Sequence, residues 1–439
     1  MTRFFKAALL ASAAIAAVGG AQADDDLEAR IAALEAMVAE LKAELEAERD
    51  DIIRVEQKTD QMADEVAEVV TAVNTPSNDG FRIGDTRLAF GGLIDLDVHV
   101  SEFSDGTVAS SSIARDFYIP GATPVGGESS EVLTDFTAQA SRFYLTADQD
   151  IGGHEVSGRI ELDFLGSLQG NERVSNSFSP RLRLAYVNVD NWRFGQDWTT
   201  FQNTSAIPES ASFLILSDGM VFIRQPQIRY TRGNLQFSLE NGDTTITPLS
   251  GGRIEADTQF VPDGVIRYNH TGDFGNISLA GIARQLRADI PGVVDDSAFG
   301  WGLSASGRVK LGSRDDLRFN VVGGEGLGRY VGLNATNAAF VSPAGDLEPV
   351  RTIGGLVAWR HPFGESARFN IGVSGLFADN PDFAAPGATR NVQSGYLAVL
   401  TDIAPRVTVG GEILYGRREL ESGAEGDLMR FTFSTKYAF

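Results

Sequence analysis

The amino-acid sequence predicts an all-β transmembrane barrel of 16 antiparallel strands, preceded by an N-terminal α-helical coiled coil. Three observations lead to this prediction. They are strict apolar–polar alternation in the final strand, a heptad pattern near the N-terminus, and short and long connections that alternate between the strand-like segments. After the N-terminus no apolar run approaches the ~20 residues of a membrane-spanning helix, so a spanning protein of this sequence has to be a barrel.

Composition narrows the class of protein before any single element is considered. The 439 residues include 48 glycines, 27 phenylalanines and no cysteine, which excludes a disulfide framework and thiolate chemistry. The formal net charge of −22 argues against nucleic acid as a partner. We expect neither a cofactor nor a metal site.

Residues 1–23 have the features of a signal peptide. Arg3 and Lys6 give a positive start, residues 7–18 are apolar, and Ala21–Ala23 form an A-x-A cleavage site. The mature chain is expected to begin at the acidic residue that follows. An anchored helix is the disfavoured alternative, because the apolar segment is too short to span a bilayer.

Residues 24–73 predict a long coiled-coil helix. Its apolar seam advances by alternating steps of four and three residues. The first eight seam residues are Leu27, Ile31, Leu34, Val38, Leu41, Leu45, Ile52 and Val55. A single helix cannot bury this stripe, so the pattern predicts oligomerisation, with dimers and trimers both open. The alternative is that the helix folds back on its own barrel. A linker rich in residues that end helices, residues 74–81, follows.

From residue 82 to 439 the period of the pattern changes to two, as expected for barrel strands. In the last strand, near 428–439, aromatic residues alternate with polar ones as far as the terminal Phe439. We expect sixteen such strands, with an uncertain register at 181–190 and 192–201. Lipid on one face and water on the other explain the alternation.

The connections between these strands alternate between tight turns and long polar loops. A turn such as Gly152-Gly153 is followed by a loop, and loops are expected at positions that include 288–297, 379–391 and 419–427. Outer-membrane barrels have short periplasmic turns and long external loops. We therefore expect a protein of the bacterial outer membrane with both barrel ends, and the coiled coil, in the periplasm.

Strand parity points many basic residues into the lumen. The predicted pore-lining residues include Arg142, Arg159, Arg229, Arg267 and Arg360, with Asp95 and Asp97 as opposing acids. Opposing charges create a transverse field across a wet pore, and guanidinium groups bind carboxylates bidentately. The alternative is that these charges pair with one another and only solvate the wall.

The connection 202–224 is the predicted constriction loop. It carries Glu209, Asp218 and Arg224 together with the apolar run Phe213–Leu216. This run is expected either to line a narrow eyelet or, as slightly favoured, to pack against a neighbouring subunit.

Several segments resemble the DcaP-like family of trimeric outer-membrane porins. They are FGGLIDLDV (90–98), RFYLTADQDIG (142–152), RFGQDWTTF (193–201) and IRQPQIRYT (223–231), together with the N-terminal coiled coil. The resemblance implies a sixteen-stranded barrel, a homotrimer, a periplasmic helical extension and uptake of small anions such as dicarboxylates and aromatic acids. By strand position, the residues that resemble the basic lumen of the family are Arg142, Arg183, Arg193, Arg224 and Arg229.

We therefore predict a passive porin with a preference for organic anions, embedded in the outer-membrane bilayer. The aromatic end at Phe439 resembles the signal read by the barrel-assembly machinery, a second expected partner. A structural tether or adhesin that uses the coiled coil is the alternative function. An enzyme is disfavoured, because the four histidines are dispersed and form no recognisable Ser–His–acid arrangement.

Overall fold

The computed structural model describes residues 39, 42, 80–129, 132–166, 170–171 and 175–439. The chain divides into two compact units, Met1–Asn78 and Asp79–Phe439. In the first unit only Ala39 and Lys42 are described, and both are helical. The predicted signal peptide, the coiled-coil seam and the linker before residue 80 lie outside the described residues. Within the described ranges, no helix is long and apolar enough to cross a membrane.

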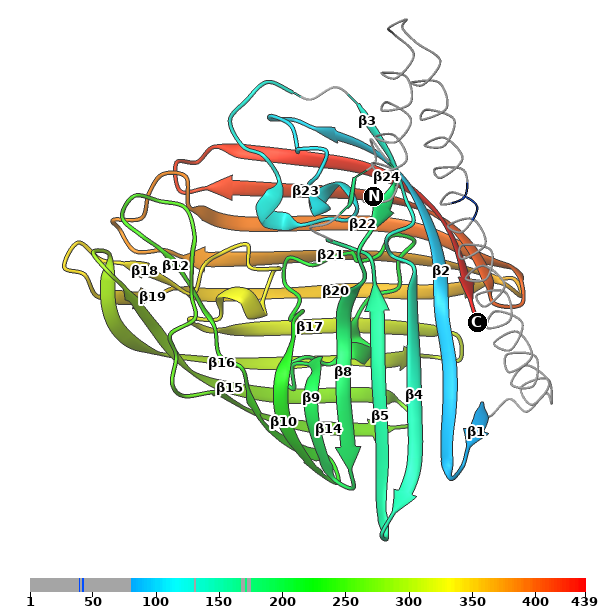
Figure 1. Ribbon diagram of the computed structural model, residues 1–439. Coiled ribbons are helices and arrows are strands. Elements are labelled where there is room, and N and C mark those ends of the chain that lie inside the picture. The colour runs from blue at the N-terminus through cyan, green and yellow to red at the C-terminus, as the bar shows by residue number, and fades with distance from the viewer. Residues whose placement is uncertain (1–38, 40–41, 43–79, 130–131, 167–169, 172–174) are drawn as a thin grey trace, which may run out of the picture. The chain divides into compact units, whose positions relative to one another are not determined.

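The second unit is a closed barrel of sixteen antiparallel strands, as the alternation predicts (Figure 1). The strands are β2 (Thr86–Phe103), β4 (Arg142–Ile151), β5 (His154–Asp163), β8 (Arg181–Val189), β9 (Trp192–Trp198), β10 (Arg224–Arg232), β11 (Leu235–Glu240), β14 (Asp263–Gly272), β15 (Gly275–Ile290), β16 (Val294–Leu311), β17 (Asp315–Glu325), β20 (Arg351–Phe363), β21 (Ala367–Asp379), β22 (Thr389–Ala404), β23 (Val407–Leu420) and β24 (Glu425–Ala438). Pairing of β24 with β2 closes the barrel. Two short strands, β1 (Phe81–Ile83) and β3 (Leu133–Thr137), also pair with β2.

Side chains on β24 alternate between the outside and the inside of the barrel. Phe431 and Phe433 point outward and are 47% and 43% exposed, whereas Arg430, Thr432 and Ser434 between them are buried. The same parity on β2 buries Asp95 and Asp97 and exposes Ile94 and Leu96. A lipid-facing wall around a polar interior requires this arrangement.

The two ends of the barrel differ in their connections. At one end, called the short-turn end, consecutive strands are joined by two or three residues, for example 152–153 and 190–191. At the other end, called the loop end, three predicted loops are shorter than expected. β15 and β16 are joined by 291–293, β21 and β22 by 380–388, and β23 and β24 by 421–424. In the β15–β16 hairpin, Ala288 and Val294 are buried in a cluster with loop residues, so the apolar face is covered by protein and the outward positions are polar, unlike those of a lipid-facing strand.

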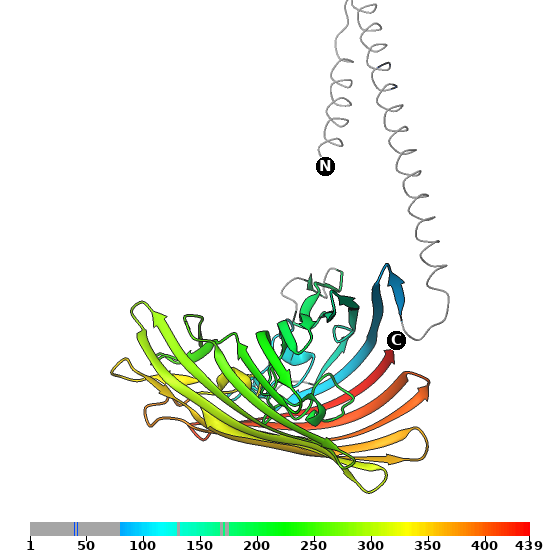
Figure 2. The ribbon, with the colours of Figure 1, turned by 90° about the horizontal axis from the view of Figure 1, so that it is seen from below.

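Long loops from the loop end fold into the barrel (Figure 2). They carry the 3-10 turns η1 (Ile113–Arg115), η2 (Pro120–Ala122), η3 (Thr204–Ala206) and η4 (Gly328–Tyr330). Their apolar side chains pack against inward-facing residues of the wall and form the core. The interior is therefore partly filled by protein.

Two separate loops also build a small sheet. Its four strands are β12 (Thr244–Thr247), β13 (Ile254–Ala256), β18 (Ala339–Val341) and β19 (Leu347–Pro349). This sheet packs on residues of β15 and β16 around Ile246 and Leu286. A two-residue ladder, β6 (Gly170–Asn171) with β7 (Ser177–Phe178), completes the described strands.

Candidate pore lumen

The constriction loop, residues 199–223 between β9 and β10, folds into the barrel and packs on the inner face of β20–β23. Leu214, Ile215 and Leu216 are buried against wall side chains such as Leu356 and Leu400. The sequence prediction that this apolar run contacts a neighbouring subunit or lines an eyelet is wrong for these three residues. They face their own wall because the inward side chains there are apolar, and burying them removes both surfaces from water.

Glu209 fastens the loop to the wall through charge. Its carboxylate accepts hydrogen bonds from Arg360 (2.9 Å) and Arg368 (2.7 Å). Burial raises the pKa of Glu209, but Arg368 and Arg360 outweigh burial and hold that pKa below its usual range. The carboxylate therefore stays ionised, and its two guanidinium partners are fixed against the wall.

Asp218 fastens the other end of the loop and is fully buried. Its carboxylate accepts a hydrogen bond from the Tyr118 hydroxyl (2.7 Å) and another from the Ser394 hydroxyl. Burial raises the pKa of Asp218 to about 6, although these two hydrogen bonds oppose the shift. The predicted loop member Arg224 is instead the first residue of β10. Asp218 is thus a structural anchor that does not line the open lumen.

A basic cluster, defined here as Arg142, Arg159, Arg181 and Arg183, occupies the wall formed by β4, β5 and β8. Glu161 accepts hydrogen bonds from Arg159 (2.7 Å) and Arg183 (2.8 Å) and lies 3.7 Å from Arg142. Asp163 is bound by Arg183 (2.6 Å) and, through two nitrogens at 2.8 Å, by Arg181. Four guanidinium groups thus share two carboxylates.

A second basic group lies on β9 and β10. Arg193 and Arg229 both contact the carboxylate of Asp197, the latter at 3.2 Å. Arg193 also stacks on the Tyr186 ring, with its guanidinium carbon 4.0 Å from the ring centre. Arg229 donates a further hydrogen bond to the hydroxyl of Thr200 (2.8 Å). Two guanidinium groups share one carboxylate here as well.

Aromatic rings complete the basic wall. The Arg224 guanidinium lies 4.6 Å from the ring centre of Trp198, and Phe213 of the constriction loop faces Arg142 and Arg183 at 5.9 and 5.6 Å. Nη1 of Arg224 and Nε of Arg142 have no hydrogen-bond partner among the described residues. Phe213 therefore contributes to the lumen wall, unlike the rest of its apolar run.

The remaining predicted residues lie apart from this wall. Arg267 donates to the backbone oxygen of Gln202 at the start of the constriction loop. Asp95 and Asp97 are buried on β2, where Asp95 lies 3.9 Å from Lys436. Asp95 and Asp97 are therefore covered and do not face open space, so they do not form the opposing acidic wall that the sequence predicts.

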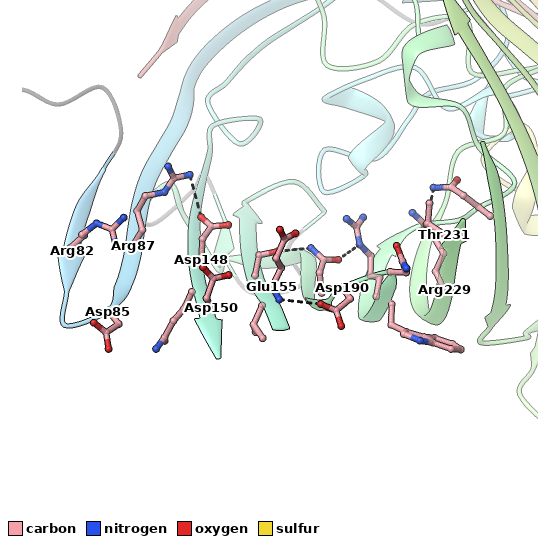
Figure 3. Close-up of a pocket in the computed structure, with 17 residues that line it drawn as sticks. Arg82, Asp85, Arg87, Asp148, Asp150, Glu155, Asp190, Arg229 and Thr231 are labelled. Atoms are coloured by element: carbon pink, nitrogen blue, oxygen red, sulfur yellow. Dashed lines mark hydrogen bonds and ion pairs between the residues drawn. The ribbon is translucent and has the colours of Figure 1, made fainter. Parts of the chain in front are cut away.

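An open cavity of about 900 Å³ lies at the short-turn end, beside the second basic group. Figure 3 shows Arg229, with Arg87, Asp148 and Asp190 among the residues that line it. It is lined by residues of successive strands and short turns from β1 to β11. The described residues contain no group of three or more His, Cys, Asp or Glu side chains that could hold a metal ion. The cavity is therefore a charged vestibule on the same side of the barrel as the basic wall.

Arg181 was missed as a lumen residue by the sequence analysis. The β5–β8 ladder shifts register opposite Arg183, pairing Glu161 with Leu184 but Leu162 with Leu182. A β-bulge of this kind turns adjacent residues toward one face and breaks the parity on which the prediction relied. The one sequence signal for the position of Arg181 was the alternation of polar residues on its partner strand β5.

The sequence model of one family, described as DcaP outer membrane protein, matches residues 34–439. The outer membrane channel DcaP of Acinetobacter baumannii has 21% sequence identity and a TM-score of 0.68, covering 82% of this chain and 99% of that chain. The anion-selective porin from Comamonas acidovorans has 14% identity and a TM-score of 0.52, covering 81% and 100%. At these identities the two structures show a shared fold, and no curated protein matches the chain.

Proposed function

Because the chain belongs to the DcaP family of outer membrane proteins, we propose that it is a passive porin that prefers small organic anions. Dicarboxylates and aromatic acids are the proposed solutes. The supporting observation is the excess of guanidinium groups on one wall. Six of them, in the two basic groups on β4–β10, share only Glu161, Asp163 and Asp197. A surplus of fixed positive charge raises the local concentration of anions in a narrow wet passage.

The aromatic rings beside this wall support acids that carry a ring. Trp198 and Phe213 offer apolar faces next to Arg142, Arg183 and Arg224. A solute carboxylate can accept hydrogen bonds from Arg142 or Arg159, whose side chains are 27% and 25% exposed, while the rest of the solute contacts the rings. Because each contact is made with a partly satisfied guanidinium, binding is expected to be weak enough for release.

The remaining parts of the proposal concern assembly. We propose a homotrimer whose residues 24–73 form a periplasmic coiled coil, with Phe439 read by the barrel-assembly machinery during insertion. A tether or adhesin role is the second candidate. The closed sixteen-stranded barrel within one chain favours the channel, since an adhesin does not require a complete pore per chain.

Ion selectivity tests the proposal. In a planar bilayer with a KCl gradient, the wild-type reversal potential is expected to report anion preference. Arg183→Gln removes one buried guanidinium of the basic cluster and should shift the reversal potential toward cations. Arg314→Gln is the matched control, because Arg314 lies in a short turn outside the two basic groups and donates a hydrogen bond to the Gly364 carbonyl oxygen. Cation selectivity of the wild-type protein would refute the proposed preference.

A further inference from the structure

Three loops from different sides of the barrel meet at its loop end. The first joins β11 to β14, the second joins β17 to β20, and the third joins β2 to β3. β12 of the first loop pairs with β18 of the second (Figure 1). Gly121 of the third loop lies so close to the second that an added Cβ would be 3.0 Å from Cα of Ala335. Outer-membrane barrels turn their long loops toward the outside of the cell, so an arriving solute meets this assembly first.

Arg418 on β23 holds the third loop against the wall. Its side chain has the inward parity of the buried residues Glu412 and Leu414 on the same strand. Nε donates a hydrogen bond to the hydroxyl of Thr389 (3.0 Å), and Nη1 donates one to the backbone oxygen of Thr123 (3.2 Å). Nη2 donates to no described residue and reaches solvent. Both acceptors are neutral, so they position the guanidinium group without compensating its charge.

Arg253, in the turn between β12 and β13, is held in the same way. Its Nε donates to the side-chain oxygen of Asn337 (2.8 Å), and its Nη2 donates to the backbone oxygen of Asn334. Arg253 is exposed, and its Nη1 has no acceptor in the part of the chain that the structure describes. The carboxylate of Glu255 acts on Arg253 from the same hairpin but forms no ion pair with it. Here too the acceptors that fix the guanidinium group are neutral.

The two guanidinium groups come from opposite sides of the barrel to one junction between loops. β11 and β23 have seven strands between them in either direction, so the hairpin of Arg253 reaches across the barrel toward Arg418. The segments that the two residues bind are those that touch at Gly121 and Ala335. The positive charge of Arg253 acts on Arg418. Since guanidinium groups stay protonated at physiological pH, these like charges repel each other, and an anion between them would remove the repulsion.

Other arginines of the loop end are compensated by carboxylates. Arg329 of η4 lies 2.6 Å from Asp243 and so fastens the second loop to the first. Arg390 on β22 lies 3.4 Å from Glu419 on β23. An ion pair of this kind holds two elements together without leaving net charge. The positive charge at the loop junction therefore exceeds what fastening the loops requires.

We propose that Arg253 and Arg418 form a capture site for carboxylates at the external mouth of the barrel. The two oxygens of a carboxylate can accept hydrogen bonds from Nη1 of Arg253 and Nη2 of Arg418, which have no acceptor among the described residues. Because Arg418 faces inward, the site takes a dissolved acid and not a lipid headgroup. Exposed contacts of this kind are weak, so the solute can leave toward the basic wall. This inference rests on the proposed transport of organic anions and adds a site outside the two basic groups.

Single-channel recordings of the full-length protein in a planar bilayer test this site. Succinate, a dicarboxylate, is added to one side of the bilayer at a time, and the association rate constant is measured from its interruptions of the current. Arg253→Gln and Arg418→Gln should each lower this constant about threefold at ~0.1 M KCl for addition to one side only, because they remove attraction at one mouth. The difference should vanish at ~1 M KCl, where the Debye length falls to ~3 Å.

Arg390→Gln is the matched control. Arg390 is 56% exposed at the loop end and has outward parity on β22, so its loss removes the same charge at the same end without touching the capture site. This variant should keep the wild-type rate constant. Arg253→Lys retains the charge but loses the planar fork, so it should keep the association rate constant while shortening each interruption. A residue that only fastened the loops would not separate the two rates in this way.

An unchanged association rate constant in Arg253→Gln at low salt, in channels that succinate interrupts, would overturn the capture site and leave the proposed transport intact. An equal fall in Arg390→Gln would also overturn it, because general surface charge would then account for the effect. A wild-type channel that selects cations and that succinate interrupts from neither side would overturn the proposed transport together with the site.

Discussion

At the scale of single residues, shared carboxylates set the charge of the lumen. Glu161 contacts three guanidinium groups, those of Arg142, Arg159 and Arg183. Guanidinium groups keep their proton throughout the physiological range, so the positive excess of this wall does not depend on pH. pH sensitivity must instead come from carboxylates outside the basic wall.

Asp218 is the residue for which we predict such sensitivity. Its pKa is raised by burial from 3.8 to about 6, so the docked loop binds a proton more tightly than an exposed Asp218 does. Stability from this residue is therefore present at low pH and is lost as pH rises through about 6. Between pH 7.5 and pH 5, protection of the loop amides against hydrogen exchange should rise about tenfold, or about 1.4 kcal/mol.

The control for this experiment is Asp218→Asn, which cannot titrate and should abolish the pH dependence. Glu209 does not offset the effect, because its lowered pKa keeps its ion pairs intact until the pH falls below about 4.5, the ordinary value. Protection that is unchanged, or that decreases at pH 5 after correction for intrinsic exchange rates, would contradict the prediction.

The basic wall was partly predictable at this scale. Arg142 and Arg159 were assigned to the lumen by parity, and both contact Glu161. Arg183 and Arg193 came from the family resemblance, since the mixed faces of β8 and β9 left their register undetermined. The bulge opposite Arg183 explains that failure, because parity cannot be extended across an inserted residue.

At the scale of elements, close packing of the loop backbone on the wall backbone holds the constriction loop in place, in addition to its ion pairs. The Gly219 amide donates to the Ser374 hydroxyl (2.9 Å), and its carbonyl accepts from Asn320 (2.7 Å). A side chain at position 219 would lie 2.2–2.5 Å from the backbone of Gly355. Only glycine permits this approach of loop to wall.

We predict that Gly219→Ala pushes the loop away from the wall. The clash involves backbone on both sides, so the cost in unfolding free energy should be roughly 1–3 kcal/mol. Single-channel recordings should show increased open-channel noise from the loosened loop. Gly264→Ala is the matched control, because a side chain there meets no atom within 4 Å. Indistinguishable recordings of the two variants would refute the role of Gly219.

Element prediction from the sequence succeeded where lipid imposes a pattern and failed where it does not. The alternation in β2 and β24 identified both strands, which close the barrel. The ends of β15 and β16 at Ile290 and Val294 were assigned to a loop, because their apolar residues are buried against other loops and no apolar face is turned to lipid there. β12 and β18 pair across two distant loops, and no local pattern signals such pairing.

At the scale of the whole molecule, closure joins the two ends of the barrel. The β2–β24 ladder runs from Leu93 opposite Ala438 to Phe103 opposite Leu428. The family predicted from short segments is confirmed by the match over residues 34–439. The interior packing of the loops could not be derived in the same way, because it depends on shapes that form only after closure.

Phe439 takes part in this closure. A variant at this position can distinguish the stability of the folded barrel from the efficiency of its insertion in cells. Phe439 exchanges two backbone hydrogen bonds of 3.1 Å with Gly92, and its ring lies 5.7 Å from that of Phe90. Phe439→Ala keeps both backbone bonds and loses the ring contacts, so the refolded barrel should lose only about 1–2 kcal/mol of stability. If the assembly machinery reads the terminal ring, however, insertion in cells should fall far more than that loss explains.

Phe431→Ala is the control that decides between these effects. Phe431 lies on the same strand, also faces outward and is 47% exposed against 36% for Phe439. Loss of an outward ring should therefore cost both variants similar stability in refolding experiments, measured by heat-dependent gel mobility in detergent. Only Phe439→Ala should reduce the amount of folded barrel in the outer membrane. A parallel reduction for Phe431→Ala would mean that lipid contact, rather than recognition of the chain end, limits assembly.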